Sequence, residues 1–210
     1  MDHAIKFWDR LAPRYAKSPI KNMDSYNYTL NRTRSYLGEG DSVLEIGAGT
    51  GTTAIDLANN VKHITATDIS PAMIEIGREK AWNAGINNVD FIATPATVPD
   101  LTGPYDAVLA HNILHLVDNL PEVLARANAV LKPGGIFISK TFCKPTSFSP
   151  FFLMMRLAIP VMQLFGKAPF VLLITTAELK EAMDQAGFDI IETDSGPKGE
   201  IRKYIVARKR

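Results

Sequence analysis

The residues with the clearest chemical meaning are three glycines and two acids. Gly47, Gly49 and Gly51 stand at alternate positions, two residues after the acid Glu45. Glycine has no Cβ, so a loop built from it can turn tightly and lie against a ligand. The second acid, Asp68, ends the apolar run that follows this loop. A carboxylate placed there can accept hydrogen bonds from both hydroxyls of a ribose, which predicts a site for a nucleotide-like ligand.

The spacing of the glycines narrows the kind of ligand. The dinucleotide fingerprint reads G-x-G-x-x-G, whereas the third glycine here, Gly51, comes one residue earlier. The pyrophosphate of a dinucleotide lies at a helix N-terminus, where backbone N–H groups favour an anion. Glu45 would be a poor neighbour for such an anion. The segment therefore favours a cationic or amine-bearing ligand.

Two histidines are candidates for chemistry beside this ligand. His111 and His115 follow the apolar run 105–110, at the sheet edge expected to bind the ligand. Either one could contact the ligand or remove a proton, and His111 is the better candidate for a catalytic role. Packing or capping roles remain open for both. Lys140 and Thr141, at the end of another apolar run, are further candidates to line the site.

Alternating strands and helices must position these residues. Helix 71–84 has a clear start, with Ser70 as N-cap and Pro71 at its first position. Gly187 ends the helix that begins near Ala177. We expect strands at 43–44, 63–68, 89–93, 105–110, 136–140, 188–191 and 204–207, with helices at 52–58, 71–84, 119–130 and 177–187. This order predicts an α/β fold built on a mostly parallel sheet.

The ordered motifs between residues 40 and 145 resemble the class I S-adenosylmethionine (SAM)-dependent methyltransferases. The string EIGAGTG resembles their motif I, NILHL their segment after strand four, and LKPGG their tight turn before strand five. Residues 8–15 also resemble the W-D-x-x-A-x-x-Y opening of small-molecule methyltransferases. The resemblance implies a Rossmann-like three-layer sandwich with a seven-stranded, mostly parallel sheet. Its last strand would insert antiparallel between strands five and six.

The resemblance also implies which residues hold SAM. Such enzymes commonly place Gly-Asp-Ala after strand three, but this chain has Thr94-Pro95-Ala96. Pro95 has no N–H to donate. Recognition of the adenine then depends on Thr94, on the Ala96 N–H and on apolar contacts. The implied cofactor-binding residues are Tyr15, Glu45, Gly47, Ala48, Gly49, Gly51, Asp68, Ile69, Met73, Thr94, Pro95, Ala96 and His111. The motifs call for no metal.

A single methyltransferase domain is expected over residues 1–210. Residues 1–36 form N-terminal cap helices, and 37–145 form the SAM-binding core. Residues 146–174 form an apolar lid insertion, and 175–210 form a C-terminal helix and strand hairpin. The two regions outside the core are expected to select the acceptor.

The insertion at 146–174 is apolar on all sides, with only Arg156 and Lys167 charged. Its apolar stretches are interrupted before they reach the roughly 20 residues that span a membrane. Four explanations remain open for it: core packing, a lid over an apolar substrate, contact with a second subunit in a homodimer, and contact with a membrane surface.

Composition sets the remaining bounds. The net charge of +1 gives no reason to expect a nucleic-acid partner, and the basic C-terminal residues are interpreted as a solvated end. The single Cys143 excludes an internal disulfide, which favours a cytoplasmic protein. We therefore expect SAM-dependent methyl transfer to a small, apolar or amphipathic acceptor. The alternatives are an NAD-dependent oxidoreductase and a non-catalytic SAM-binding protein.

Overall fold

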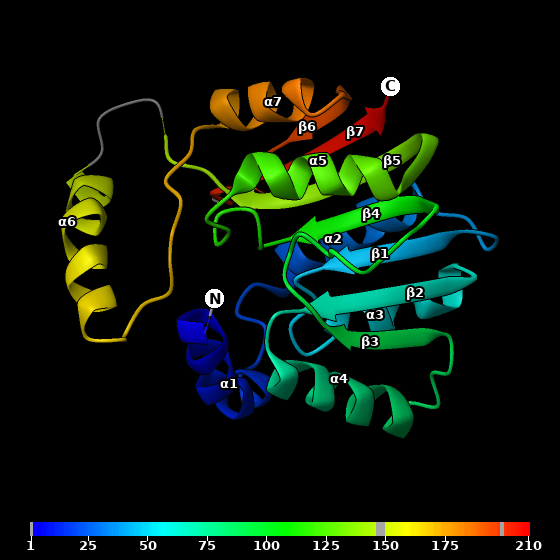
Figure 1. Ribbon diagram of the computed structural model, residues 1–210, viewed down its shortest axis with the longest axis horizontal. Helices are drawn as coiled ribbons and strands as arrows, with labels where there is room; N and C mark the ends of the chain where they lie inside the picture. The colour runs from blue at the N-terminus through cyan, green and yellow to red at the C-terminus, as the bar shows by residue number, and fades with distance from the viewer. Residues whose placement is uncertain (1, 146–149, 198–199) are drawn as a thin grey trace.

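Seven strands form one sheet in the order β3-β2-β1-β4-β5-β7-β6 (Figure 1). The computed structural model describes residues 2–145, 150–197 and 200–210. The strands are β1 (Ser42–Ile46), β2 (His63–Asp68), β3 (Val89–Ala93), β4 (Tyr105–His111), β5 (Leu131–Phe142), β6 (Phe188–Asp194) and β7 (Arg202–Lys209). The helices are α1 (Asp2–Lys17), α2 (Met23–Arg34), α3 (Thr52–Leu57), α4 (Pro71–Asn83), α5 (Leu120–Val130), α6 (Pro150–Leu164) and α7 (Thr176–Gln185), with a short 3₁₀ turn at Ala58–Asn60.

The pairing confirms the predicted Rossmann-like topology. Strands β1 to β5 run parallel, and β7 pairs antiparallel with both β5 and β6. Strand β1 lies between β2 and β4, so the direction in which successive strands are added reverses beside it. Sheets of this kind bind their ligands beyond the carboxyl ends of the strands at such a point.

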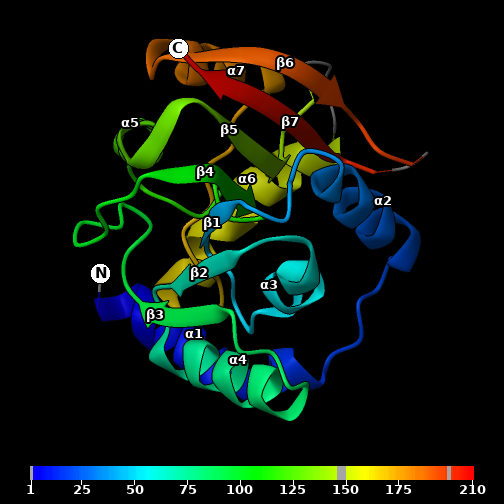
Figure 2. The same ribbon diagram turned by 90° about the vertical axis from the view of Figure 1, so that its right-hand side faces the viewer.

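Helices cover both faces of the sheet and make three layers. Helices α2 and α3 lie on one face, and α5 and α7 lie on the other (Figure 2). Leu57 and Ile64 belong to the buried cluster on the α3 side. Leu44 and Leu124 belong to the cluster on the α5 side. Apolar residues on both faces of the central strands account for their near-continuous hydrophobic runs.

The predicted helix boundaries follow local capping chemistry. The Ser70 hydroxyl accepts a hydrogen bond from the Met73 N–H at 3.1 Å, which makes Ser70 the N-cap of α4 as expected. Gly187 lies just beyond α7 with a φ of 89°, in agreement with its expected role in ending that helix.

Strand β5 starts earlier than predicted. The prediction places a tight turn at LKPGG and a strand from Ile136, whereas β5 already begins at Leu131. Leu131 pairs with Tyr105 and Ile136 pairs with Ala107, so the residues between them bulge out of the ladder. The turn is therefore an irregularity within the strand, because its backbone pairs with β4 on both sides.

Candidate active site

The glycine loop joins β1 to α3 at the carboxyl edge of the sheet. Gly47, Gly49 and Gly51 all have positive φ, at 72°, 55° and 71°. At Gly49 a Cβ would have only the Tyr15 ring within 4 Å, so the loop lies open toward α1. At Gly51 a Cβ would overlap the Phe91 ring. Gly49 thus leaves room for a ligand to approach the backbone, whereas Gly51 allows the loop to pack against the sheet.

Asp68 ties this loop to the start of α4. Its Oδ2 accepts a hydrogen bond from the Gly49 N–H at 2.9 Å, and its Oδ1 accepts one from the Ser70 N–H at 2.9 Å. Burial raises the pKa of the Asp68 carboxyl, although these two hydrogen bonds oppose the rise. Each oxygen of a carboxylate can accept a further hydrogen bond, so Asp68 can still bind two ribose hydroxyls.

Glu45 is a buried acid beside the loop. Its exposed fraction is 2%, and among the described residues its Oε2 has no hydrogen-bond partner. Burial and the nearby charge of Asp68 raise the pKa of Glu45 to about 8, although a hydrogen bond from the Ala54 N–H lowers it in part. A buried acid without a full set of partners is costly. An ammonium group on a bound ligand would supply the missing partner, so the residues present fit the amino-acid end of SAM.

This environment predicts that ligand binding releases a proton. At pH 7 the raised pKa keeps most of Glu45 protonated in the free protein. A bound ammonium group stabilises the carboxylate and lowers this pKa, so a proton leaves. Calorimetry of S-adenosylhomocysteine binding, in buffers of different ionisation enthalpy, should show close to one proton released by the wild type. Glu45→Gln should release fewer, and equal release by both proteins would contradict this role of Glu45.

The residues assigned to the adenine lie near the loop with unequal exposure. Thr94 is buried, and its N–H donates to the Asp68 carbonyl oxygen at 2.9 Å. Met73 is only 2% exposed, whereas Ile69, Pro95 and Ala96 are half-buried. The half-buried side chains are the ones that offer surface to a ligand. The assignment of Thr94, Ala96, Ile69 and Met73 to the adenine, and of Pro95 to the cofactor site, stays a prediction.

His111 lies at the end of β4 and faces α2. Its Nε2 lies 3.4 Å from the Thr33 Oγ1. Burial, together with the charge of Lys140, lowers the pKa of His111 to about 4. The imidazole is therefore neutral at pH 7, and its low basicity makes it a weak general base. Its catalytic role and its contact with the cofactor stay predictions.

The structure does not place Lys140 and Thr141 along an open acceptor site. Lys140 Nζ donates to the Ser25 Oγ at 2.7 Å and to the Thr29 Oγ1 at 2.8 Å, and both residues belong to α2. Thr141 is 0% exposed. Because α2 and α7 cover the two faces of this strand end, both side chains are enclosed in the protein.

One of the basic residues expected to form a solvated C-terminal end, Arg202, instead lies at the carboxyl edge of the sheet. Arg202 is the first residue of β7, and it pairs with Phe142, the last residue of β5. The Phe142 ring stacks on Phe152 of α6, with centroids 5.5 Å apart, and lies 5.9 Å from His115. Burial and the charge of Arg202 lower the pKa of His115 to about 4. The implied pairing of the last strand with strand five was the signal that could have located Arg202.

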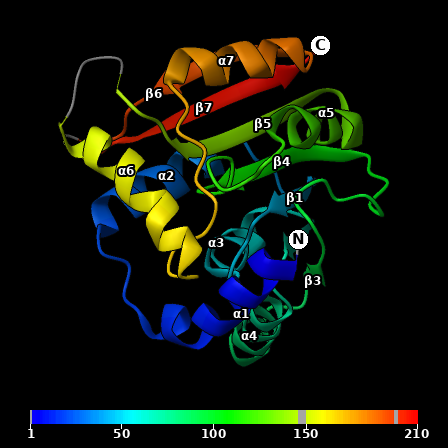
Figure 3. The ribbon, with the colours of Figure 1, turned by 60° about the vertical axis from the view of Figure 1, so that its left-hand side comes forward.

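The two regions expected to select the acceptor both lie at this edge. Helices α1 and α6 stand beyond the arrowheads of β2, β3 and β4 (Figures 1 and 3). Arg10 of α1 donates from Nη2 to the Gly166 carbonyl oxygen at 2.6 Å, just after α6. Helix α1 and the insertion at 146–174 thus meet on the side where the glycine loop opens. Residues 146–149 of the insertion lie outside the described residues.

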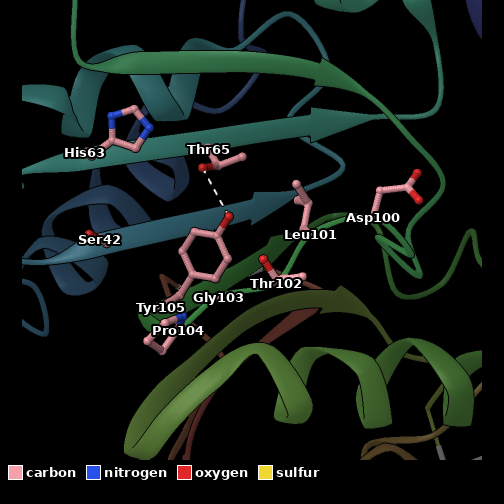
Figure 4. Close-up of a pocket in the computed structure, with 9 residues that line it drawn as sticks. All are labelled: Ser42, His63, Thr65, Asp100, Leu101, Thr102, Gly103, Pro104 and Tyr105. Carbon is pink, nitrogen blue, oxygen red and sulfur yellow. Dashed lines mark hydrogen bonds between the residues drawn. The ribbon is translucent and has the colours of Figure 1, made fainter.

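A separate pocket lies at the opposite edge. Its volume is about 320 Å³, and its lining includes Ser42, His63 and Tyr105, which begin β1, β2 and β4. The Tyr105 hydroxyl donates to the Thr65 Oγ1 at 3.3 Å across this pocket (Figure 4). The loop between β3 and β4 lines the rest of it. The pocket lies at the amino ends of the strands, away from the glycine loop, and is not the candidate active site.

Residues 9–193 match the methyltransferase domain family, and the chain belongs to this family. Membership identifies its cofactor as SAM, in agreement with the loop and the two acids. The interpretation as an NAD-dependent oxidoreductase is therefore wrong.

Curated relatives include demethylmenaquinone methyltransferases of several bacteria. The protein of Tropheryma whipplei (strain Twist) is 34% identical over 123 residues, which cover 58% of this chain and 51% of the relative. The protein of Renibacterium salmoninarum is 30% identical over 154 residues, which cover 71% of this chain and 62% of the relative. The chain thus spans about half to three-fifths of the length of these relatives.

Solved structures share the fold at low sequence identity. The [4+2]-cyclase SpnF has a TM-score of 0.78 at 19% identity, with 98% of this chain and 94% of that chain covered. A SAM-dependent methyltransferase of Methanosarcina mazei has a TM-score of 0.71 at 21% identity, with 85% and 96% covered. These likenesses show the fold alone. Because one of these structures is named a cyclase, the fold by itself does not determine the reaction.

Proposed function

We propose that this protein transfers a methyl group from SAM to a small apolar acceptor of the quinone type, in the cytoplasm. The observation that carries the proposal is the glycine loop, with Glu45 and Asp68, opening toward α1 and an apolar α6. The names of the curated relatives support a quinone-type acceptor. The lone Cys143, which needs no oxidising compartment, supports the location.

The chain's own residues then have binding and shielding roles. SAM supplies a methyl group that is already activated on a sulfonium. Glu45 holds the amine, Asp68 holds the ribose, and the backbone at Gly49 lies against the ligand. Phe142 and Phe152 form an apolar wall that excludes water and positions the acceptor. Because their low pKa values, about 4, make His111 and His115 weak general bases, positioning supplies the larger share of catalysis.

Labelled SAM tests this proposal with fractionated cell extracts. The label should move into the lipid-soluble fraction when the protein is present. Label found only in polar, water-soluble products would contradict an apolar acceptor. If the protein binds S-adenosylhomocysteine but transfers no label from SAM to any fraction, the non-catalytic interpretation is the correct one.

Helix α6 and the segment after it expose several large apolar side chains. Leu157, Leu164 and Phe165 are 68%, 82% and 69% exposed. Arg156 and Lys167 belong to this segment, Arg10 of α1 contacts it at Gly166, and the sequence has no acidic residue from 145 to 177. No helix among the described residues is long and apolar enough to cross a membrane. We propose that this lid touches an anionic lipid surface, from which an apolar acceptor enters the site.

A charge placed on this surface should weaken membrane binding. Inserting a leucine into lipid contributes about 1.5–3 kcal/mol, so Leu157→Glu should lower binding to anionic vesicles about tenfold or more. Trp82→Glu is the matched control, because Trp82 is 85% exposed on α4. Flotation with phosphatidylglycerol and phosphatidylcholine vesicles measures the effect. The membrane proposal fails if the wild type binds neither kind of vesicle. If the wild type also forms a dimer that Leu157→Glu dissociates, the surface contacts a second subunit instead.

A further inference from the structure

Arg202 lies at the carboxyl edge of the sheet, the edge that carries the glycine loop. It pairs with Phe142 at the carboxyl edge of β5, and its side chain is 43% exposed. Tyr15 of α1 lies beside Gly49, and its pKa responds to the charge of Arg202. Arg202 therefore lies at the same edge of the sheet as the glycine loop, beside Phe142, which stacks on Phe152.

Arg202 belongs to a group with more positive than negative charge. Its Nη1 lies 3.3 Å from the Glu200 Oε1, and the Lys140 Nζ lies 3.3 Å from the Glu200 Oε2. Burial pushes the pKa of Glu200 up, but a hydrogen bond from Ser25 and the two cations lower it to about 2. One carboxylate is thus shared by two cations. Because Lys140 is enclosed by α2, Arg202 is the partly exposed member that can meet a ligand.

The guanidinium also has an unused donor. Its Nε is buried, and it has no hydrogen-bond partner among the described residues. A buried donor without a partner is costly, and an anionic oxygen is the strongest partner for a guanidinium. A ligand that brings such an oxygen to this point would satisfy both the donor and the excess positive charge.

We propose that Arg202 binds an acidic oxygen of the acceptor, a carboxylate or an ionised phenol or enol, while the acceptor's apolar part lies against Phe142 and Phe152. This inference rests on the proposed function and narrows its acceptor to an acidic, ring-bearing molecule. Arg202 thus selects and orients the acceptor.

Binding of a matched pair of probes tests the assignment in protein saturated with S-adenosylhomocysteine. 2-Naphthoate and 2-naphthamide have the same shape, but only the first is an anion. The wild type should bind 2-naphthoate at least about tenfold more tightly, because charge-assisted hydrogen bonds are the stronger ones. Arg202→Gln should remove this preference without weakening the binding of 2-naphthamide. Arg202→Lys should keep part of the preference.

Arg208→Gln, on the exposed far end of the same strand, is the control and should keep the full preference. 2-Naphthol and 2-methoxynaphthalene test whether Arg202 also favours a phenolic hydroxyl over its methyl ether. Equal binding of acid and neutral probe by the wild type, a preference that survives Arg202→Gln, or no binding of any probe would overturn the assignment. S-adenosylhomocysteine binding is measured first, because its loss would point to failure of the proposed function instead.

Discussion

Gly49→Val is expected to abolish binding of S-adenosylhomocysteine. The φ of 55° at Gly49 is costly for valine, and the added methyl groups enter the open space between the loop and Tyr15. At a ligand concentration one hundred times its Kd, the wild type should gain about 2.7 kcal/mol of stability. The variant should gain none, and thermal unfolding with and without ligand measures the difference.

Gly134→Val is the control that distinguishes loss of the ligand site from the effect of backbone strain. Gly134 has a similar φ of 73°, and a Cβ there would meet no atom within 4 Å. It lies in the bulge of β5, at the opposite edge of the sheet. This variant should lose stability but keep the full ligand-induced shift. A full shift in Gly49→Val would show that the ligand does not bind against the loop.

Asp68→Ala is expected to weaken S-adenosylhomocysteine binding about 100-fold or more. The change removes the acceptor for two ribose hydroxyls, and hydrogen bonds to a charged group contribute about 1.5–3 kcal/mol each. It also leaves the N–H groups of Gly49 and Ser70 without the carboxylate that holds them at 2.9 Å. The loop thus loses its attachment to α4 at the same time. Titration calorimetry gives the change in affinity.

Asp41→Ala is the matched control for this variant. Asp41 also accepts a backbone hydrogen bond, from the Gly38 N–H to Oδ2 at 2.8 Å, but in the turn before β1. Its loss should leave the affinity for the ligand unchanged. If both variants weaken binding equally, the effect of Asp68 is a general loss of stability and the ribose assignment fails.

The sequence predicted best those parts of the fold that depend on local signals. The bounds of β2 and β3 agree with the predicted strands 63–68 and 89–93, because turn residues delimit both apolar runs. Ser70 and Pro71 located the start of α4 in the same way. The predicted insertion of the last strand, antiparallel between strands five and six, is also confirmed, but it came from the family resemblance.

The surroundings of His111 and Lys140 could not be predicted, because they depend on packing between distant segments. Ser25, Thr29 and Thr33 are polar residues of α2 that would be expected to face water. In the structure they are buried against the strand ends. No local pattern marks this face of α2 as buried. Arg202 was missed for the same kind of reason, since its position depends on the register of β7 against β5.

Methyl transfer to a reduced, prenylated naphthoquinone that lacks the ring methyl group tests the central claim most directly. Purified protein with methyl-labelled SAM should place the label in the lipid-soluble product. Gly134→Val should retain this activity, and Gly49→Val should lose it. Protein that S-adenosylhomocysteine stabilises, but that leaves all the label in SAM with this acceptor and with lipid extracts, would contradict the account.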